Sequence, residues 1–458
     1  MKEQGITLTD FVKGLRLHSD TPTNQEALTE CFNLIPRIQG LISTPTISHP
    51  ITAVTVSHPW PQIFLGYKHW VCCTEDKIYT INANWSLTLQ LDLAVYYNTF
   101  PNAPKETWHF ADFFDYVVLT NGGVTVVYNP LTSDWEYNDG TTLPTLGSVL
   151  NFKGQIIGTG RTTVVGDPKT AFQDTDANSL MWGGIGSANF VLDQSNVKGY
   201  RPMPWYGEIY KVMELGDYII AYGLKGIAVC KFSNMALGIV KTFKFGIASR
   251  EAVGGDDSTH ILIDTEGNLR KLSTDLAMSE PVYNEFFSTM LGREVIVTYN
   301  SLQNEFYITD GIRGFILTSK GLGETFQAPT TLDINAGILI GFYTDLQNSD
   351  AMIVTDSIDF GTKAFKTLDV VEVGAASSAN IEVAIDFKLT ASGAFQSTDW
   401  KTLNPNGTVV FPIKAIEFKI KVRSLNYSNL KISYIQLRVK FDDKRFIRGT
   451  SNANKATA

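Results

Sequence analysis

The chain has 458 residues, a formal net charge of −8 and 44% hydrophobic residues. This length exceeds one ordinary hydrophobic core, so two domains are expected, and the hydrophobic content is that of a globular protein. No stretch approaches about 18 uninterrupted apolar residues, which excludes a membrane-spanning helix, and the first residues lack the apolar segment of a secretion signal.

Residues 1–50 are predicted to be an extended lead-in. Proline residues at 36, 45 and 50 break it, and a short helix is expected from Asn24 to Asn33. Residues Ile51 to His58 alternate in polarity, which predicts a strand. We expect this strand to complete the last sheet of the following domain, because a ring left open would expose a pairing edge.

A short pattern then recurs six times before residue 320. A polar or turn residue leads into three or four strand-forming residues, followed by a tight turn, often with Gly, and a second strand. The copies begin at His69, Asp115, Gly154, Asp217, His260 and Glu305. Their spacing of about 47 residues is typical of propeller blades, small sheets that bury their faces only against each other. Residues 51–349 are therefore predicted to form a β-propeller of about six blades, or of seven if the long segment between Gly158 and Asp217 contains a further one.

From about residue 350 the strands are expected to be longer. In Ile416–Arg423 the apolar residues take one face and the charged residues the other, as in a half-buried antiparallel strand. In Leu430–Phe441 the apolar phase switches, which predicts a β-bulge near Tyr434–Ile435. Residues 350–448 are predicted to be a C-terminal β-sandwich, and residues 449–458 a flexible tail.

Charge is distributed unevenly along the chain. Residues 401–458 hold twelve Lys or Arg and three acids, so the first 400 residues carry a net −17. Such polarity informs about partners rather than fold. The basic side of the last strands is a solvated face, a protein-docking face or a DNA contact. The candidate docking residues are Lys419, Lys421, Arg423, Arg438 and Lys440.

No arrangement of residues in the sequence predicts catalysis, a metal site or a cofactor. The six histidines are scattered without a ligand spacing, and the glycine-rich segments lack the Lys-Ser/Thr of a phosphate loop. The four cysteines fit no zinc pattern and are expected to be reduced. Trp135, Trp182 and Trp205, at blade ends, are expected to pack between blades rather than bind glycans.

Several segments together resemble the tail nozzle proteins of short-tailed bacteriophages, also called tail stabilisation proteins and loosely related to tail tubular protein B. The opening Gln25–Pro36, running into Gly40–Pro45, resembles theirs. Ser179–Phe190 is similar to a Trp-Ser-x-Ile-Gly-Asp-Pro blade segment, with Gly183 replacing Ser and Ser187-Ala188 replacing Asp-Pro. Phe245–Arg250 and Asp359–Thr362 resemble later parts of the same family.

The resemblance implies a non-enzymatic structural virion protein. It would form a homo-oligomeric, hexameric ring as the distal tube of a short tail, made and assembled in the host cytoplasm. Its partners would be portal or adaptor rings and tail fibre, spike or needle proteins, with genomic DNA passing through the lumen without specific binding. The alternatives are a glycan-binding propeller of a tail tip and a propeller enzyme with acids clustered at one channel mouth.

Overall fold

The computed structural model describes residues 3–8, 14–15, 27–137, 144–160, 178–188, 190, 198–233, 236–345, 350–375, 380–425 and 430–441. The chain divides into two compact units. One holds Thr46–Ile312 and Gln327–Thr344, and the other holds Met1–Pro45, Arg313–Phe326 and Asp345–Ala458. Nearly all regular structure is β, and in the described ranges no helix is long and apolar enough to cross a membrane.

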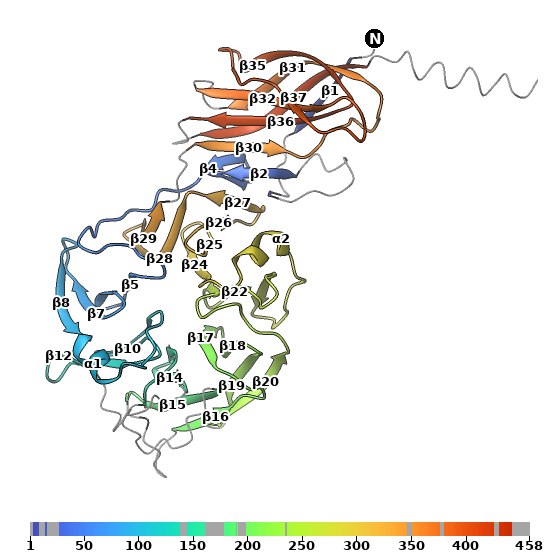
Figure 1. Cartoon of the computed structure of the whole chain (residues 1–458). Helices are drawn as coiled ribbons and strands as arrows, with labels where there is room; N and C mark the ends of the chain where they lie inside the picture. The colour runs from blue at the N-terminus through green and yellow to red at the C-terminus, as the bar shows by residue number, and fades with distance from the viewer. Residues whose placement is uncertain are drawn as a thin grey trace, which may run out of the picture. The chain divides into compact units, whose positions relative to one another are not determined.

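The first unit is a β-propeller, a set of small antiparallel sheets arranged radially around a centre (Figure 1). Four sheets have four strands each: β5–β8 (Gln62–Leu65, Trp70–Cys73, Lys77–Ile81, Leu87–Asp92), β9–β12 (His109–Phe113, Tyr116–Thr120, Thr125–Asn129, Asp134–Tyr137), β13–β16 (Val149–Phe152, Gln155–Thr159, Ser179–Ile185, Gly199–Pro202) and β17–β20 (Ile209–Leu215, Tyr218–Gly223, Ile227–Ser233, Ala236–Phe243). A three-stranded sheet, β21–β23, follows (Val253–Gly255, Thr259–Ile263, Leu269–Ser273).

Two strand pairs complete the ring of this unit: β24–β25 (Ile296–Asn300, Glu305–Thr309) and β28–β29 (Gln327–Asn335, Ile338–Asp345). The described residues therefore supply seven inner strands, β5, β9, β13, β17, β21, β24 and β28. The higher of the two predicted numbers holds, but the additional sheet does not lie between Gly158 and Asp217. The six sequence repeats correspond to the first six sheets. The pair β28–β29, whose turn is Ala336–Gly337, is the one that the pattern missed.

The blade sheets are buried on both faces because each is packed between two others. In β18, every residue from Ile219 to Gly223 is buried, so the strand reads as a continuous apolar run instead of an alternation. Trp182 and Phe152 of the third sheet share one core cluster with Ile219 and Ala228 of the fourth. Helices are confined to connections: α1 (Ala94–Thr99), α2 (Asn284–Phe287) and the 3₁₀ turn η1 (Ser288–Met290).

Two predictions for the first sixty residues were wrong. The expected helix at 24–33 is a strand, β2 (Leu28–Phe32), where it is described. The segment 51–58 has no strand; instead Ser48 forms a parallel bridge with Ile340 of β29, through bonds to Leu339 O (2.9 Å) and Gly341 N (3.0 Å). The seventh sheet is thus extended from the N-terminal side, as expected, but by a residue that lies before the predicted strand.

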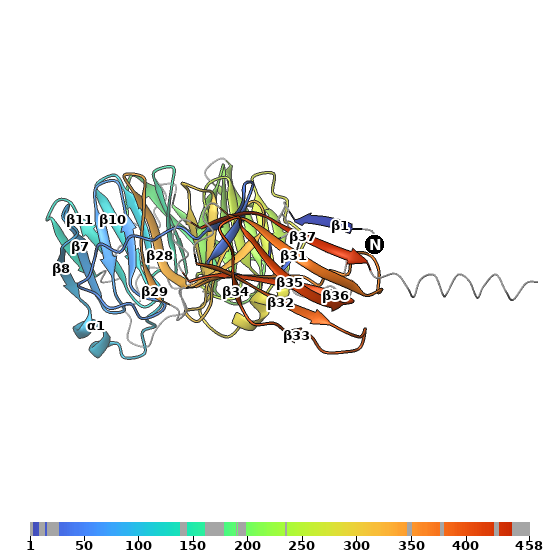
Figure 2. The ribbon, with the colours of Figure 1, turned by 90° about the horizontal axis from the view of Figure 1, so that it is seen from above.

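The second unit contains two sheets. One has the order β3-β4-β37-β31-β35, with β1 also paired to β37, and β31 and β37 run side by side (Figure 2). Within this unit the other has the order β26-β27-β2-β30-β36-β32-β33, with β34 paired to β32. The bounds are β1 Glu3–Leu8, β3 Leu34–Arg37, β4 Gly40–Ser43, β26 Gly314–Leu317, β27 Leu322–Thr325, β30 Ala351–Thr355, β31 Lys366–Ala375, β32 Ile381–Lys388, β33 Gln396–Ser397, β34 Lys401–Thr402, β35 Thr408–Ala415, β36 Glu417–Ser424 and β37 Lys431–Phe441.

Residues 1–50 are therefore not a separate lead-in, because β1 to β4 belong to the two sheets of the second unit. The predicted alternation of β36 is confirmed, with Phe418, Ile420 and Val422 buried between partly exposed basic residues. The bulge in β37 is also confirmed, one residue earlier than expected: Ser433 is extra, between Ile432 and Tyr434, in the register with β31. The predicted tail 449–458 lies outside the described residues.

The inner strands of the propeller are joined to one another by hydrogen bonds that involve side chains. Neighbouring sheets are linked by Gln62 Oε1 to Trp108 N (2.7 Å), Asn151 Nδ2 to Asp112 O (2.8 Å), Ser148 Oγ to Val212 N (3.1 Å) and Lys211 Nζ to Val253 O (3.2 Å). An inner strand has no further strand on its inward edge, so its free backbone groups need such partners.

The ring closes where β28 meets β5. The Thr331 hydroxyl bonds both the N–H (3.3 Å) and the carbonyl (3.2 Å) of Ile63, and Asp333 Oδ2 accepts the N–H of Leu65 (2.9 Å). Thr330 donates to Pro61 O (2.9 Å). Side chains of β28 thus bond the backbone groups of β5 that a neighbouring strand would otherwise bond.

We predict that Thr331→Val destabilises the propeller by about 1–3 kcal/mol, because the isosteric side chain leaves a buried backbone N–H and carbonyl without a partner. The free energy of unfolding from urea titration measures this. Thr132→Val, at an exposed turn, is the control and should change it by less than about 0.5 kcal/mol. Equal stabilities of the two variants would contradict the closure described above.

Candidate functional site

The candidate site is the cavity at the centre of the propeller, which lies entirely within one unit. Its volume is about 490 Å³, and all seven inner strands contribute to its lining. The size is that of an ordinary small-ligand pocket. Because the strands arrive from sheets far apart in sequence, the cavity gathers side chains that no local motif would reveal.

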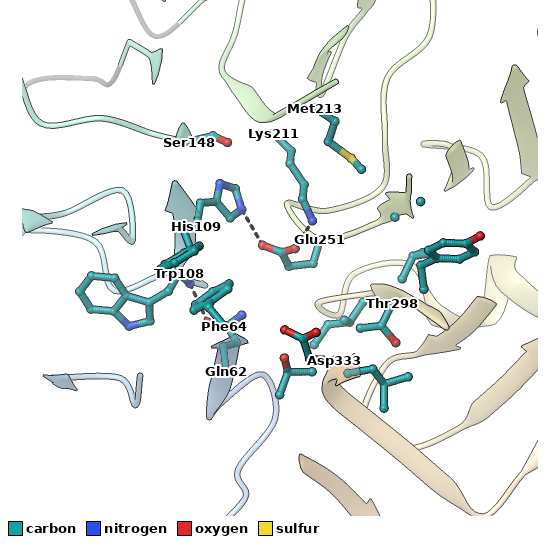
Figure 3. Close-up of a pocket in the computed structure, with 18 of the residues that line it drawn as sticks. Gln62, Phe64, Trp108, His109, Ser148, Lys211, Met213, Glu251, Thr298 and Asp333 are labelled. Atoms are coloured by element: carbon teal, nitrogen blue, oxygen red, sulfur yellow. Dashed lines mark hydrogen bonds and ion pairs between the residues drawn. The ribbon is translucent and has the colours of Figure 1, made fainter. Parts of the chain in front are cut away.

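A buried ionic network centred on Glu251 forms part of the cavity lining (Figure 3). Glu251 Oε1 accepts hydrogen bonds from Thr107 Oγ1 (2.7 Å) and His109 Nε2 (2.7 Å), and its Oε2 accepts from Lys211 Nζ (2.5 Å). The Glu251 and His109 side chains are 9% and 5% exposed. The network joins the second, fourth and fifth sheets through a single carboxylate.

The network fixes the charge states of its members. Burial alone would raise the pKa of Glu251, but the Lys211 charge and the hydrogen bonds from His109 and Lys211 outweigh it and hold that pKa well below its usual value. Burial lowers the pKa of His109 to about 4, in spite of the nearby Glu251 charge. At neutral pH His109 is therefore uncharged, and it carries its proton on Nε2, because a carboxylate can only accept.

A second carboxyl, Glu294, lies next to this network. Its Oε1 accepts the Glu251 N–H (3.0 Å), and its backbone carbonyl accepts a bond from His58 Nε2 (2.7 Å). Burial, with a further contribution from the Glu251 charge, raises the pKa of Glu294 to about 7. An ion pair between Arg250 Nη1 and Glu106 Oε2 (2.7 Å) lies in the same region. A group that titrates near neutrality is thus held beside one that stays ionised.

We predict that Glu251→Gln destabilises the protein by about 3–5 kcal/mol, because it leaves the Lys211 charge, 19% exposed, without its counter-charge. The free energy of unfolding is the measurement. Adding Lys211→Met should recover part of the loss, since both charges are then removed. Glu136→Gln, at an exposed position, is the control. A loss no greater than that of the control would mean that the network does not support the ring.

We also predict a pH dependence due to Glu294. Between about pH 4.5 and 7 the folded state holds the Glu294 proton and the unfolded state does not, so this residue's contribution to stability falls as pH rises. The unfolding free energy of the wild type, minus that of Glu294→Gln, should therefore fall by about 3 kcal/mol from pH 4.5 to 8. Taking this difference removes the opposing effect of buried histidines. A difference independent of pH would contradict the assignment.

The five basic residues predicted from sequence do not form one face. Lys419, Lys421 and Arg423 lie on β36 in one sheet, whereas Arg438 and Lys440 lie on β37 in the other. Their docking role stays a prediction, but it applies to two separate surfaces.

Acids on the neighbouring strands pair with four of these five residues. The pairs are Lys421–Asp386 (2.7 Å), Arg423–Glu382 (2.7 Å), Arg438–Glu372 (3.3 Å) and Lys440–Asp369 (2.6 Å). Lys419 Nζ lies 5.0 Å from the centre of the Phe395 ring. Counting charge from residue 401 onward missed these acids, because they precede it in sequence while lying beside the basic strands in the sheets.

The other predicted features fall in packing positions. All four cysteines are unbridged and buried, and burial raises the pKa of Cys72 and of Cys230 to about 12, which makes them poor nucleophiles. Trp135 and Trp182 are buried in core clusters. Trp205 packs on Gly226, where an added Cβ would lie 2.6 Å from its ring. Among the described residues, no three His, Cys, Asp or Glu are grouped to hold a metal ion.

Comparison with known proteins identifies no family for this chain. No protein-family model and no curated protein matches the chain. Among solved structures it is similar to the WD40 domain of Neurospora crassa Pan2 (7% identity, TM-score 0.38, 64% of this chain and 85% of that one). It is also similar to PorZ, a bacterial surface component of the type-IX secretion system of Porphyromonas gingivalis (8% identity, TM-score 0.35, 74% of this chain and 44% of PorZ). The chain is all-β with a propeller, and neither neighbour bears on phage tails.

Proposed function

We propose that this chain is a structural, non-enzymatic virion protein: a subunit of the ring that forms the distal tube, or nozzle, of a short phage tail. Its place would be the virion tail, after assembly in the host cytoplasm. The ring would conduct and retain the genome and anchor other tail parts. The sequence resemblance at residues 25–45, 179–190 and 245–250 is the source of this identity.

One observation supports a framework role over catalysis: Glu251 and Thr331, at the propeller centre, are hydrogen-bonded to neighbouring sheets. Glu251, the most central carboxylate, is occupied by Thr107, His109 and Lys211. Thr331 is likewise bonded to the backbone of β5. A general acid or base must be within reach of a substrate proton, and these groups are buried with protein partners.

The alternative is a glycan-binding tail-tip module, but two of the tryptophans that would be its main candidate residues are buried. That reading requires exposed aromatic side chains in repeated blade pockets. Trp135 and Trp182 are 8% and 6% exposed and pack between sheets. Tyr67 and Tyr206 are highly exposed, but they lie on unrelated turns and form no repeated pocket among the described residues.

The assembly state tests the proposal. Mass photometry of the purified chain, alone and mixed with a portal–adaptor assembly, should reveal a ring of six copies of the 50.7 kDa chain in at least one condition. Negative-stain class averages should then have six-fold symmetry. A chain that stays monomeric in both conditions, and is retained on a glycan array, would replace the proposal with the alternative.

A further inference from the structure

The lining of the central cavity has an excess of negative charge. Its carboxylates are Glu214, Glu251, Asp256, Asp257 and Asp333, and the lysine among its residues is Lys211. Lys211 is already paired with Glu251, and His109 is neutral at pH 7. Four carboxylates therefore line the cavity outside the Glu251 network.

Nearby lysines are engaged with other acids. Lys68 is paired with Asp115, and Lys153 with Asp217 at 2.5 Å, and none of these four residues lines the cavity. The Lys153 charge also acts on Glu214 and opposes the effect of burial on its pKa. Burial raises the pKa of Asp333 and of Glu214, so ionising either one in this place is unfavourable. A positive charge brought into the cavity would offset that cost.

Aromatic rings line the same cavity. Phe64 and Phe110 are both half-buried, and their rings stack with centroids 5.2 Å apart and an interplanar angle of 6°. Tyr299 lines it as well, and the Asp256 carboxylate accepts a hydrogen bond from its hydroxyl (3.1 Å). Carboxylates combined with aromatic faces favour organic cations, because the ring face is the negative end of its quadrupole.

Two buried polar atoms of the lining have no hydrogen-bond partner in the part of the chain that the structure describes. His109 Nδ1 and Thr298 Oγ1 are buried and bond to none of the described residues. With its proton on Nε2, His109 presents Nδ1 as an acceptor, and its side chain is 95% buried. Within the described ranges His109 Nδ1 thus lacks a hydrogen-bond donor, and an organic cation with N–H groups would supply one.

We propose that the central cavity binds an organic cation with an apolar stem, an alkylammonium or alkylguanidinium group. The stem would lie against Phe64 and Phe110, and the charged head would be bonded by the carboxylates of Glu214 and Asp257, which interact electrostatically with each other. A metal ion fits less well, because the described carboxylates do not converge in a group of three. This inference does not depend on the ring-assembly proposal.

Such a group has two sources: a free polyamine, or the side chain of Lys or Arg on a partner protein. Isothermal titration with agmatine and with 1,5-diaminopentane tests the first, and a Gly-Ser peptide carrying one Arg tests the second. Tighter binding of the small amines assigns the site to a free ligand, and tighter binding of the peptide assigns it to a protein side chain. Both results support the proposal.

Substitution of single carboxylates in the cavity lining provides the sharper test. Glu214→Gln and Asp257→Asn should each weaken binding by about tenfold, because each removes one charge near the cation. Asp115→Asn, whose carboxylate pairs with Lys68 outside the cavity, is the matched control and should change the affinity by less than about twofold. Circular dichroism and thermal melting confirm that each variant is folded.

A spectroscopic signal locates the ligand. In long-range ¹H–¹⁵N spectra, saturating agmatine should shift the His109 imidazole resonances and leave those of His260, which is bonded through both ring nitrogens, unchanged. The proposal is overturned if none of the three probes binds saturably, if 1-pentanol binds as well as 1,5-diaminopentane, or if Asp115→Asn weakens binding as much as Glu214→Gln.

Discussion

Each inner strand of the propeller has an inward edge with no neighbouring strand, and the fold depends on how the backbone groups of that edge are satisfied. In an ordinary sheet an unpaired edge is exposed to water or covered. Here the edges converge on a narrow cavity, so bonds from side chains of adjacent sheets take the place of a strand. Thr331 at Ile63, Gln62 at Trp108 and Ser148 at Val212 are examples.

This constraint explains why the centre of an otherwise apolar unit is polar. The Glu251 network links three sheets, and a buried charge network of this kind is stable only when every member has a partner. Residues that resemble a catalytic cluster in composition, His109, Lys211 and Glu251, are in this arrangement part of the framework. Other carboxylates of the lining, such as Glu214 and Asp257, lie outside this network, whereas Asp333 takes part in ring closure through the N–H of Leu65.

The sequence allowed the architecture to be predicted, because each blade repeats a local pattern of strand, tight turn and strand. The alternation of β36 and the bulge in β37 were equally local, since both follow from side-chain parity within one strand. The seventh sheet was missed because the recognised copies end before residue 320, although Gly337 leads into β29 as Gly154 leads into the third copy. Helix periodicity was wrongly inferred at 24–33, where pairing of β2 with β30, more than 300 residues away, decides the structure.

The candidate site could not be predicted either, because its residues are brought together by contacts between strands that are far apart in sequence. Lys211 and Glu251 are 40 residues apart, and His109 and Glu251 are 142 residues apart. Only the closure of the ring brings them together. The pairing of the five basic candidate residues was missed for a related reason: Glu372, Glu382 and Asp386 lie on neighbouring strands, and counting charge along the sequence assigned these acids to another region. Features that depend on the order of side chains within one strand could be predicted from the sequence. Features that depend on contacts between strands could be found only from the structure.

Amide hydrogen exchange at β5 tests the central claim most directly. The ring account predicts that the Ile63 and Leu65 amides exchange as slowly as the core amides of β18, because Thr331 and Asp333 hold them. Thr331→Val should release Ile63 and leave Leu65 protected. Rapid exchange of both amides in the wild-type protein would contradict a closed ring.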